Sequence, residues 1–313
     1  HGARLVPWDG TLDDHPLRMP WARPGGPTGD LEFARSVVGA HGTPVQHRTW
    51  NLSSIWSIPS RSGRAWLKCV PGFFAHEPRV LELLAGHPVP RPLAVDGHRL
   101  LLDALPGVDG YGATYDEHCT LIDELVEIQR WSAEHLDDLG AAGVPDRRLP
   151  ELVRLARRVV ERRAPSDESL TELLDDAPAR LSELGGCGLP DVLVHGDAHP
   201  GNARLGEGAG RGLWFDWGDS CLGHALTDLA VLDRPGVEHA DELRAHWLGA
   251  WGTAVPGSDP ARAWELLRPL AALGAAVVYQ GFLDAIEPSE RVYHEGDVLP
   301  WLRLAARLAR GDP

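Results

Sequence analysis

Lysine is almost absent from this chain of 313 residues. The sequence holds a single lysine, Lys68, while arginine accounts for the other 29 of its 30 basic residues. Such a bias replaces lysine with arginine wherever either residue serves, so a lysine that remains can mark a position that needs a compact ammonium group. Chance retention is the alternative, and the place of Lys68 among the predicted elements decides between the two.

Cysteine is also scarce, and the four cysteines include no C-x-x-C pair. This spacing argues against a disulfide framework and against a zinc site, and it fits a reducing compartment. Long apolar runs are missing too, because the longest uncharged stretch, residues 269–283, is too short to span a bilayer. The first residues show no signal-peptide pattern. We therefore expect a cytoplasmic protein without a membrane span.

Basic residues are too few to balance the acidic ones. The 45 Asp and Glu residues exceed the 30 Lys and Arg residues, which gives a net charge of −15. This charge argues against nucleic acid and against an anionic membrane surface as partners, and it is compatible with a cationic substrate. We expect a small-molecule partner and a monomer or homodimer. The length suits one large domain or two lobes.

Strand patterns dominate the first third of the chain. Residues 1–40 are rich in Pro and Gly and are predicted to form an irregular arm, with a short helix at about 31–38. Alternating apolar residues between turn residues then predict a series of strands. The strands are expected at residues 45–48, 55–58, 65–70, 92–95 and 99–102, with Asp96-Gly97 as a hairpin turn and a helix at 74–84.

Beyond Pro106-Gly107, helical periodicity takes over. Helices are predicted at 117–136, 151–163 and 169–184 and from about 226 to the end, with short strands at 192–194 and 213–215. A sheet-rich first third, joined near Asp103 to a helical remainder, predicts an α+β fold with two lobes. We place these lobes at residues 1–103 and 104–313.

The most informative segment is residues 195–202, with the sequence His-Gly-Asp-Ala-His-Pro-Gly-Asn. It places Asp197 and Asn202 five positions apart, and Asp216 follows fourteen residues after Asn202. Phosphoryl transfer from ATP needs one carboxylate that positions a hydroxyl nucleophile. It also needs hard ligands, such as an amide and a second carboxylate, that hold a divalent cation. The pattern predicts a small-molecule kinase.

This segment resembles the motif of the aminoglycoside phosphotransferase and choline kinase family, whose members are relatives of the protein kinases. The resemblance extends over about residues 45–232 and includes residues 77–92 and 223–230. It implies a two-lobed protein-kinase-like fold, with a small antiparallel-sheet N-lobe and a larger, mainly helical C-lobe. The N-lobe would bind the nucleotide, and the C-lobe would hold the catalytic loop and the acceptor.

The resemblance also implies roles for individual residues. Asp197 would be the catalytic carboxylate that takes the proton of the acceptor hydroxyl. Asn202 and Asp216 would hold Mg²⁺, which prefers oxygen ligands, beside the phosphates of ATP. Asp228 would accept backbone N–H groups of the catalytic loop.

Lys68 falls near the end of a predicted strand, 129 residues before Asp197. The protein-kinase-like fold places at this point the lysine that contacts the α- and β-phosphates. Glu77, on the next predicted helix, would pair with Lys68 and orient it, and Glu82 is the alternative partner. The position therefore favours a functional lysine over chance retention.

The loop that covers the phosphates would be residues 49–54. It contains no glycine, unlike the corresponding loop of protein kinases, so the Ser53 and Ser54 hydroxyls and backbone amides are the expected contacts. The stretch Asp103-Ala104-Leu105 lies at the predicted lobe junction, where backbone groups would bind adenine.

The acceptor is expected to be an antibiotic of the aminoglycoside, nucleoside or peptide type, whose phosphorylation would confer resistance. Four acidic residues are candidates for binding ammonium groups, with an ordinary acidic surface as the alternative: Asp219, Asp284, Glu287 and Glu290. Four late tryptophans are expected in the core, or else stacked on a sugar or nucleobase: Trp247, Trp251, Trp264 and Trp301.

Three other functions remain open. The first is a metabolic kinase for a substrate such as choline, homoserine, methylthioribose or a ketosamine. The second is a nucleotide-binding pseudokinase, against which the complete set of predicted site residues argues. The third is a metal hydrolase built on His195, Asp197 and His199, which would leave Lys68 and Asp216 without a role. We expect both histidines to support the catalytic loop instead.

Overall fold

The computed structural model describes residues 15–39, 41–61, 63–206 and 212–311, so that residues 1–14 of the predicted arm lie outside the described residues. The rest of the arm differs from the prediction, because a 13-residue helix, α1, runs over Gly26–Val38. The Pro and Gly residues that suggested irregular structure mark its ends instead. Pro27 lies in the first turn, and Gly39 has the left-handed conformation (φ 57°) that often terminates helices.

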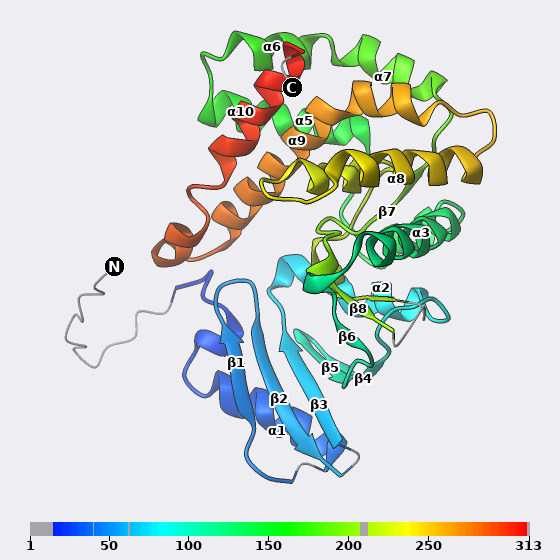
Figure 1. Cartoon of the computed structure of the whole chain (residues 1–313). Coiled ribbons are helices and arrows are strands. Elements are labelled where there is room, and N and C mark those ends of the chain that lie inside the picture. The colour runs from blue at the N-terminus through cyan, green and yellow to red at the C-terminus, as the bar shows by residue number, and fades with distance from the viewer. Residues whose placement is uncertain (1–14, 40, 62, 207–211, 312–313) are drawn as a thin grey trace.

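A five-stranded antiparallel sheet forms most of the N-terminal region (Figure 1). The strands lie in the order β1-β2-β3-β5-β4, and α1 packs on one face of the sheet. Their bounds are β1 Val45–Thr49, β2 Ser54–Ser60, β3 Gly63–Cys69, β4 Pro92–Asp96 and β5 Arg99–Asp103. The five predicted strands are confirmed to within two residues at each end, and the sheet is complete at Asp103.

Helix α2 connects β3 to β4 and covers Glu77–Leu83, a shorter span than the predicted 74–84. Residues 72–74 form a separate 3₁₀ turn. The reason is Pro78, which has no N–H to donate to the carbonyl of Phe74 and so is tolerated only in the first turn of a helix. This start leaves Glu77 only 2% exposed, directed at the sheet.

The remainder of the chain is mainly helical (Figure 1). The helices are α3 Tyr115–Ser132, α4 Leu136–Ala141, α5 Leu149–Arg163, α6 Glu168–Asp175, α7 Ala177–Gly186, α8 Ala240–Ala254, α9 Pro260–Ala285 and α10 Val298–Ala309. The single helix predicted at 169–184 is wrong, because two helices occupy that stretch. Pro178 lies in the first turn of α7 and has no N–H to donate to the carbonyl of Leu174, so α6 cannot continue through it.

Among the described residues, α9 is the one helix whose length and composition would allow it to cross a membrane. Its apolar window is 72% buried inside the fold, where α9 packs against α5 and α10. Burial of this extent is typical of the central helix of a protein core. The helix therefore gives only weak support for a membrane span.

Short strands position residues 195–202. Strand β7 (Asp191–Val194) pairs with β10 (Cys221–His224). Strand β8 (Ala203–Leu205) pairs with β9 (Leu213–Trp214) and with β6 (Val108–Asp109). Since β7 and β8 flank the loop while β9 and β10 flank residues 215–220, the two sets of pairings bring these loops together.

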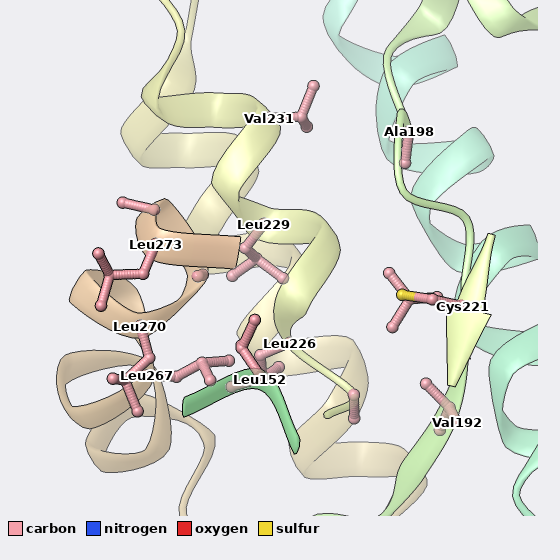
Figure 2. Close-up of a cluster of buried hydrophobic side chains, with 14 of the residues drawn as sticks. Leu152, Val192, Ala198, Cys221, Leu226, Leu229, Val231, Leu267, Leu270 and Leu273 are labelled. Atoms are coloured by element: carbon pink, nitrogen blue, oxygen red, sulfur yellow. The ribbon is translucent and has the colours of Figure 1, made fainter. Parts of the chain in front are cut away.

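The core of the helical region lies directly behind this loop. Figure 2 shows Ala198 and Cys221 on one side, facing leucines of α9 and of the 3₁₀ segment η6, Thr227–Asp233. The late tryptophans belong to this core, as expected, since Trp247 and Trp251 are fully buried and Trp264 is 5% exposed. Trp301 is half-buried and lines a cavity beside the loop.

Candidate active site

Asp228, in η6, holds the start of the catalytic loop, residues 195–202. Its carboxylate accepts the backbone N–H groups of His195 (2.9 Å) and Gly196 (2.8 Å) and the side-chain amide of Gln129 (2.8 Å). Burial raises the pKa of Asp228 to about 6, although the hydrogen bonds oppose this shift. Gly196 is required here, because its φ is 87° and a Cβ would lie 2.3 Å from the carbonyl oxygen of Asp219.

Asp197 lies within the loop, and cationic and amide groups surround its carboxylate. The Asn202 amide donates to the Asp197 backbone carbonyl and to Oδ2, both at 2.9 Å. The Arg234 guanidinium lies 2.7 Å from Oδ1, and His199 Nε2 lies 3.4 Å from Oδ2. Burial opposes ionisation, but His199 and Arg234 together hold the pKa of Asp197 below its usual range. The carboxylate is therefore ionised at neutral pH.

Arg234 was not predicted from the sequence. It follows η6 and precedes a proline, 37 positions after Asp197, and neither its spacing nor its neighbours distinguish it from the other arginines. Only the path of η6 behind the loop brings its guanidinium to the carboxylate.

His195 supports the loop, in agreement with its expected role. Its Nε2 lies 3.0 Å from the carbonyl oxygen of Phe215, and its Nδ1 accepts the N–H of Asp197 at 3.4 Å. The ring is fully buried and packs near Trp214 and Trp217 (centroids at 5.3 and 4.6 Å), and burial lowers its pKa to about 4. Both ring nitrogens of a neutral imidazole are thus engaged. This arrangement argues against a metal site built on His195 and His199.

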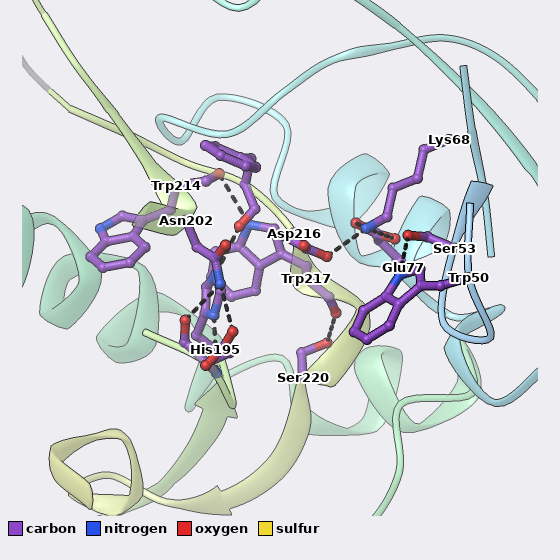
Figure 3. Close-up of polar contacts among 12 residues, drawn as sticks. Trp50, Ser53, Lys68, Glu77, His195, Asn202, Trp214, Asp216, Trp217 and Ser220 are labelled. Carbon is purple, nitrogen blue, oxygen red and sulfur yellow. Dashed lines mark hydrogen bonds and ion pairs between the residues drawn. The ribbon is translucent and has the colours of Figure 1, made fainter. Parts of the chain in front are cut away.

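Lys68 lies between two carboxylates, one from each side of the site (Figure 3). Its Nζ is 2.7 Å from both Oε atoms of Glu77 and 2.6 Å from Oδ1 of Asp216. Burial opposes the charge of the ammonium group, but the two carboxylates outweigh burial and raise the pKa of Lys68. The predicted pairing with Glu77 is present in the structure. Glu82 instead pairs with Arg79 on the exposed side of α2.

Asn202 and Asp216 are held side by side by backbone pairing. The N–H of Phe215 donates to the carbonyl of Asn202 at 2.9 Å, and β8 and β9 continue the pairing from there. Asp216 has φ 64° and ψ 58°, a left-handed conformation that Asp tolerates better than most residues. Because the side-chain nitrogen of Asn202 is hydrogen-bonded to Asp197, the side-chain oxygen of Asn202 is the atom that remains to bind a metal ion. An amide oxygen and a carboxylate form a donor set that suits Mg²⁺.

Ser53 and Ser54 differ in what their hydroxyl groups can still do. The Ser53 hydroxyl accepts the indole N–H of Trp50 at 3.0 Å, which leaves its own hydrogen available (Figure 3). The Ser54 hydroxyl accepts the indole N–H of Trp56 at 3.0 Å and lies 3.1 Å from the Thr49 hydroxyl. Since Thr49 donates to a backbone carbonyl, Ser54 is the donor in that contact. Ser53 is the better candidate for contacting a phosphate.

The stretch from Asp103 to Leu105 leaves β5 and enters the helical region. Asp103 Oδ1 accepts the N–H of Ala104 at 2.8 Å. The side chain of Asp103 therefore occupies a backbone donor that adenine would otherwise use, and nucleotide binding at this N–H would have to displace it.

The acidic residues predicted to bind the acceptor do not form one cluster. Asp284 pairs with Arg162 at 2.7 Å, and Glu287 forms a two-point ion pair with Arg18 at 2.8 and 3.1 Å. Asp219 alone lies beside the catalytic loop. Burial, together with the nearby Asp197 and Asp216, raises the pKa of Asp219 to about 7.

Comparison with known proteins assigns this arrangement to a family. The phosphotransferase enzyme family (APH) matches residues 71–270, more than half of the chain. The chain belongs to this family. The resemblance first drawn from residues 195–202 is thus confirmed, and the family member is a small-molecule phosphotransferase with a kinase-like fold.

Several solved structures share the fold of this phosphotransferase. The apoenzyme of macrolide 2'-phosphotransferase from Brachybacterium faecium has 19% identity and a TM-score of 0.60, with 91% of this chain and 99% of that chain covered. Choline kinase from Streptococcus pneumoniae has 13% identity and a TM-score of 0.61, with 90% and 97% covered. The GDP and kanamycin complex of APH(2")-IIia has 14% identity and a TM-score of 0.60, with 92% and 98% covered.

These likenesses confirm the predicted two-lobed α+β fold. Their identities are too low to transfer a substrate from any of them. No curated protein matches the sequence.

Proposed function

We propose that this phosphotransferase transfers the γ-phosphoryl group of ATP, with Mg²⁺, to a hydroxyl group of an antibiotic and thereby confers resistance. The observation that carries the proposal is the arrangement around Asp216. Its carboxylate lies 2.6 Å from Lys68 on one side, and on the other side backbone pairing holds it next to Asn202, whose amide bonds Asp197. The predicted nucleotide-binding lysine, the predicted metal-binding pair and the predicted catalytic carboxylate thus form one connected group.

Each residue of this group has a separate task in phosphoryl transfer. Lys68, oriented by Glu77, would bind the α- and β-phosphates, and Ser53 would donate a hydrogen bond to a phosphate oxygen. Asn202 and Asp216 would hold Mg²⁺, which when bound neutralises the charge of the nucleotide phosphates. In the reaction, the acceptor oxygen bonds to the γ-phosphorus while the bond from that phosphorus to the β–γ bridging oxygen breaks.

Asp197 takes the proton of the acceptor hydroxyl, so that the products are a phosphate ester and ADP. Because the transition state for this transfer is loose, orientation of the hydroxyl matters more than strong basicity. A low pKa of Asp197 is therefore compatible with catalysis. The backbone of residues 103–105 would bind the base, and ATP is our proposed donor.

The wider proposal retains the lobes at residues 1–103 and 104–313. We propose a cytoplasmic enzyme, a monomer or a homodimer, that binds neither nucleic acid nor a membrane. An antibiotic acceptor is supported by the macrolide and aminoglycoside enzymes among the structural neighbours. The choline kinase among them favours, as the second candidate, a kinase of a small metabolite.

The test is ADP release from ATP in the presence of Mg²⁺, measured over a panel of hydroxylated antibiotics and metabolites. Asp197→Ala is the control for background hydrolysis. We expect at least one antibiotic to stimulate ADP release by the wild-type protein alone. Stimulation only by metabolites would favour the second candidate. If no compound stimulates ADP release above the Asp197→Ala background, the kinase proposal fails and a nucleotide-binding pseudokinase is favoured.

A further inference from the structure

A cavity of about 70 Å³ lies beside the catalytic loop. Gly196 and Ala198 of the loop form one wall, and small residues of α9, including Ala271 and Ala275, lie opposite them. Figure 2 shows Ala198 and the η6 side of this space. Trp301 of α10 also lines it. Arg234 lines the same cavity and contacts Asp197, so a single side chain separates the space from the catalytic carboxylate.

A wider groove of about 490 Å³ lies next to this cavity, between α5 and α9. Arg147 lines both spaces, so the two lie on either side of this residue. The groove is lined by Leu155, Val159 and Val277, together with Arg158 and Arg162. A molecule that enters the cavity beside Asp197 can therefore extend along an apolar floor edged with guanidinium groups.

The carboxylates that line the two spaces are already engaged. Asp228 accepts the backbone of the catalytic loop, as described above. Asp146 accepts two hydrogen bonds from the Arg148 guanidinium (2.6 and 3.0 Å) and one from its backbone N–H (3.0 Å), and Asp284 pairs with Arg162 at 2.7 Å. No carboxylate in either space is left to bind an ammonium group.

Two arginines in these spaces have no ion-pair partner among residues 15–39, 41–61, 63–206 and 212–311. They are Arg147, which is half-buried, and Arg158, which is exposed. The backbone N–H of Arg147 donates to the carbonyl of Leu222 at 2.8 Å, and its side chain lies near the Cys221 thiol. Arg147 acts on the Asp219 carboxyl only through its charge, which lowers the pKa of Asp219 against the larger effect of burial, and no ion pair between the two is formed.

We infer that the acceptor of this phosphotransferase carries an acidic group, such as a carboxylate, on a largely apolar body, and that Arg147 binds that group where the cavity meets the groove. This inference rests on the proposed kinase function, because it assumes that the molecule bound here is the phosphate acceptor. It narrows the substrate class of that same site. A polycationic aminoglycoside would meet two guanidinium groups here and no available carboxylate.

The binding part of the inference can be measured without nucleotide. The probe is anilinonaphthalene sulfonate, an aromatic anion, and the matched probe is phenylnaphthylamine, which has the same rings without the sulfonate. In fluorescence titrations we expect Arg147→Gln to weaken binding of the sulfonate about tenfold and to leave the uncharged probe unchanged. Arg147→Lys retains the charge and should retain most of the affinity.

Arg157→Gln is the control, because Arg157 lies on α5 next to Arg158 but pairs with Asp175 at 3.0 Å. Arg158→Gln, at an exposed position, is a second variant in case Arg147→Gln does not fold, and we expect a smaller loss of sulfonate binding. The inference is overturned if the wild-type protein does not bind the sulfonate probe more tightly than the uncharged probe. It is also overturned if Arg157→Gln weakens binding of the sulfonate probe as much as the Arg147 and Arg158 variants do.

The substrate part is measured as ADP release with hydroxylated carboxylic acids and their methyl esters. We expect each productive acid to exceed its ester, and Arg147→Gln to remove that preference. Esters that match or exceed the acids would overturn the inference while leaving the kinase function intact. If no acceptor stimulates ADP release, the kinase function fails, and the dye titrations still decide whether Arg147 forms an anion site.

Discussion

The single lysine of the sequence lies between two carboxylates. Lys68 Nζ lies within 2.7 Å of three carboxylate oxygens from Glu77 and Asp216, and its side chain is 13% exposed. A single ammonium nitrogen can donate to all three oxygens from one point. The planar guanidinium of arginine is larger and directs its donors in a fixed fork. Replacement by arginine is therefore not conservative here.

We predict that Lys68→Arg lowers kcat/KM by about 100-fold, because the new side chain cannot place its charge at the phosphates while it also contacts Glu77 and Asp216. ADP-release kinetics measure the effect, and thermal unfolding shows whether the fold is kept. Retained turnover in a folded Lys68→Arg protein would contradict the role of Lys68 in binding ATP.

A single side chain, Arg234, also controls the ionisation of Asp197. The Arg234 guanidinium, 2.7 Å from Oδ1, and His199 keep the pKa of Asp197 low against the effect of burial. A lowered pKa means that Asp197 stays ionised as the pH falls, so its protonation limits the wild-type rate only in strong acid.

Replacing Arg234 with Gln removes this stabilisation of the carboxylate, so we predict that the pKa of Asp197 rises. The acidic limb of the kcat/KM profile should then move to higher pH, by about one unit or more, whereas Arg234→Lys should keep it near the wild-type position. The profile is measured from pH 8 down to the most acidic pH at which both proteins stay folded. If Arg234→Gln changes the rate equally at every pH, Arg234 acts on the substrate and does not tune Asp197.

At the level of elements, the phosphate loop between β1 and β2 contains a matched pair of serines. The Ser53 hydroxyl keeps its hydrogen free, whereas the Ser54 hydroxyl donates to Thr49 within the N-lobe. We predict that Ser53→Ala raises KM for ATP about tenfold, because a hydrogen bond to a charged phosphate is lost. Ser54→Ala should leave KM unchanged and lower the free energy of unfolding by about 1 kcal/mol.

Kinetics and urea unfolding of the two variants separate these outcomes. Each serine serves as the control for the other, since the two are adjacent in the chain and both are buried. An increase in KM for ATP in Ser54→Ala alone would reverse the assignment.

The helices show where local sequence patterns fail to predict structure. The prediction at 169–184 followed apolar periodicity and passed over Pro178, whose missing N–H separates α6 from α7. The Pro-rich and Gly-rich arm was predicted to be mostly irregular because these residues usually break helices. In α1 they stand at the ends of the helix, where they are favoured, so composition without position gave the wrong result.

Contacts between distant segments of the chain limit how much of the site can be predicted from the sequence. Asp197, Asn202, Asp216 and Lys68 were predictable because short motifs or a unique residue type mark them. Arg234 and Arg147 carry no such mark among 29 arginines. Only the folded chain shows that Arg234 contacts Asp197 and that Arg147 lines the cavity beside the loop. The same holds for the acidic candidates for the acceptor site, since Asp284 and Glu287 have arginine partners far away in the sequence that no local pattern reveals.

For the whole molecule, the two regions also meet away from the chain connection near Asp103 and from the Lys68–Asp216 ion pair. The segment η7, Pro288–Tyr293, lies against the phosphate loop. The Asn51 side chain donates to the carbonyl of Glu290 at 3.3 Å and lies 3.2 Å from Nε2 of His294. Arg18 and Glu287 add an ion pair at the same interface. These contacts restrain the loop that would cover the phosphates.

We predict that Arg18→Ala loosens this interface, because it removes both hydrogen bonds to Glu287, whose side chain is 16% exposed. Hydrogen–deuterium exchange should become faster in residues 49–54. KM for ATP should rise about threefold with kcat nearly unchanged, since the change affects how the loop is held and leaves the catalytic group in place. Arg154→Ala is the control, because Arg154 pairs with Glu151 on the surface of α5 and takes no part in the contact between η7 and the phosphate loop. A loss of kcat without faster exchange in residues 49–54 would show that Arg18 acts elsewhere than on the phosphate loop.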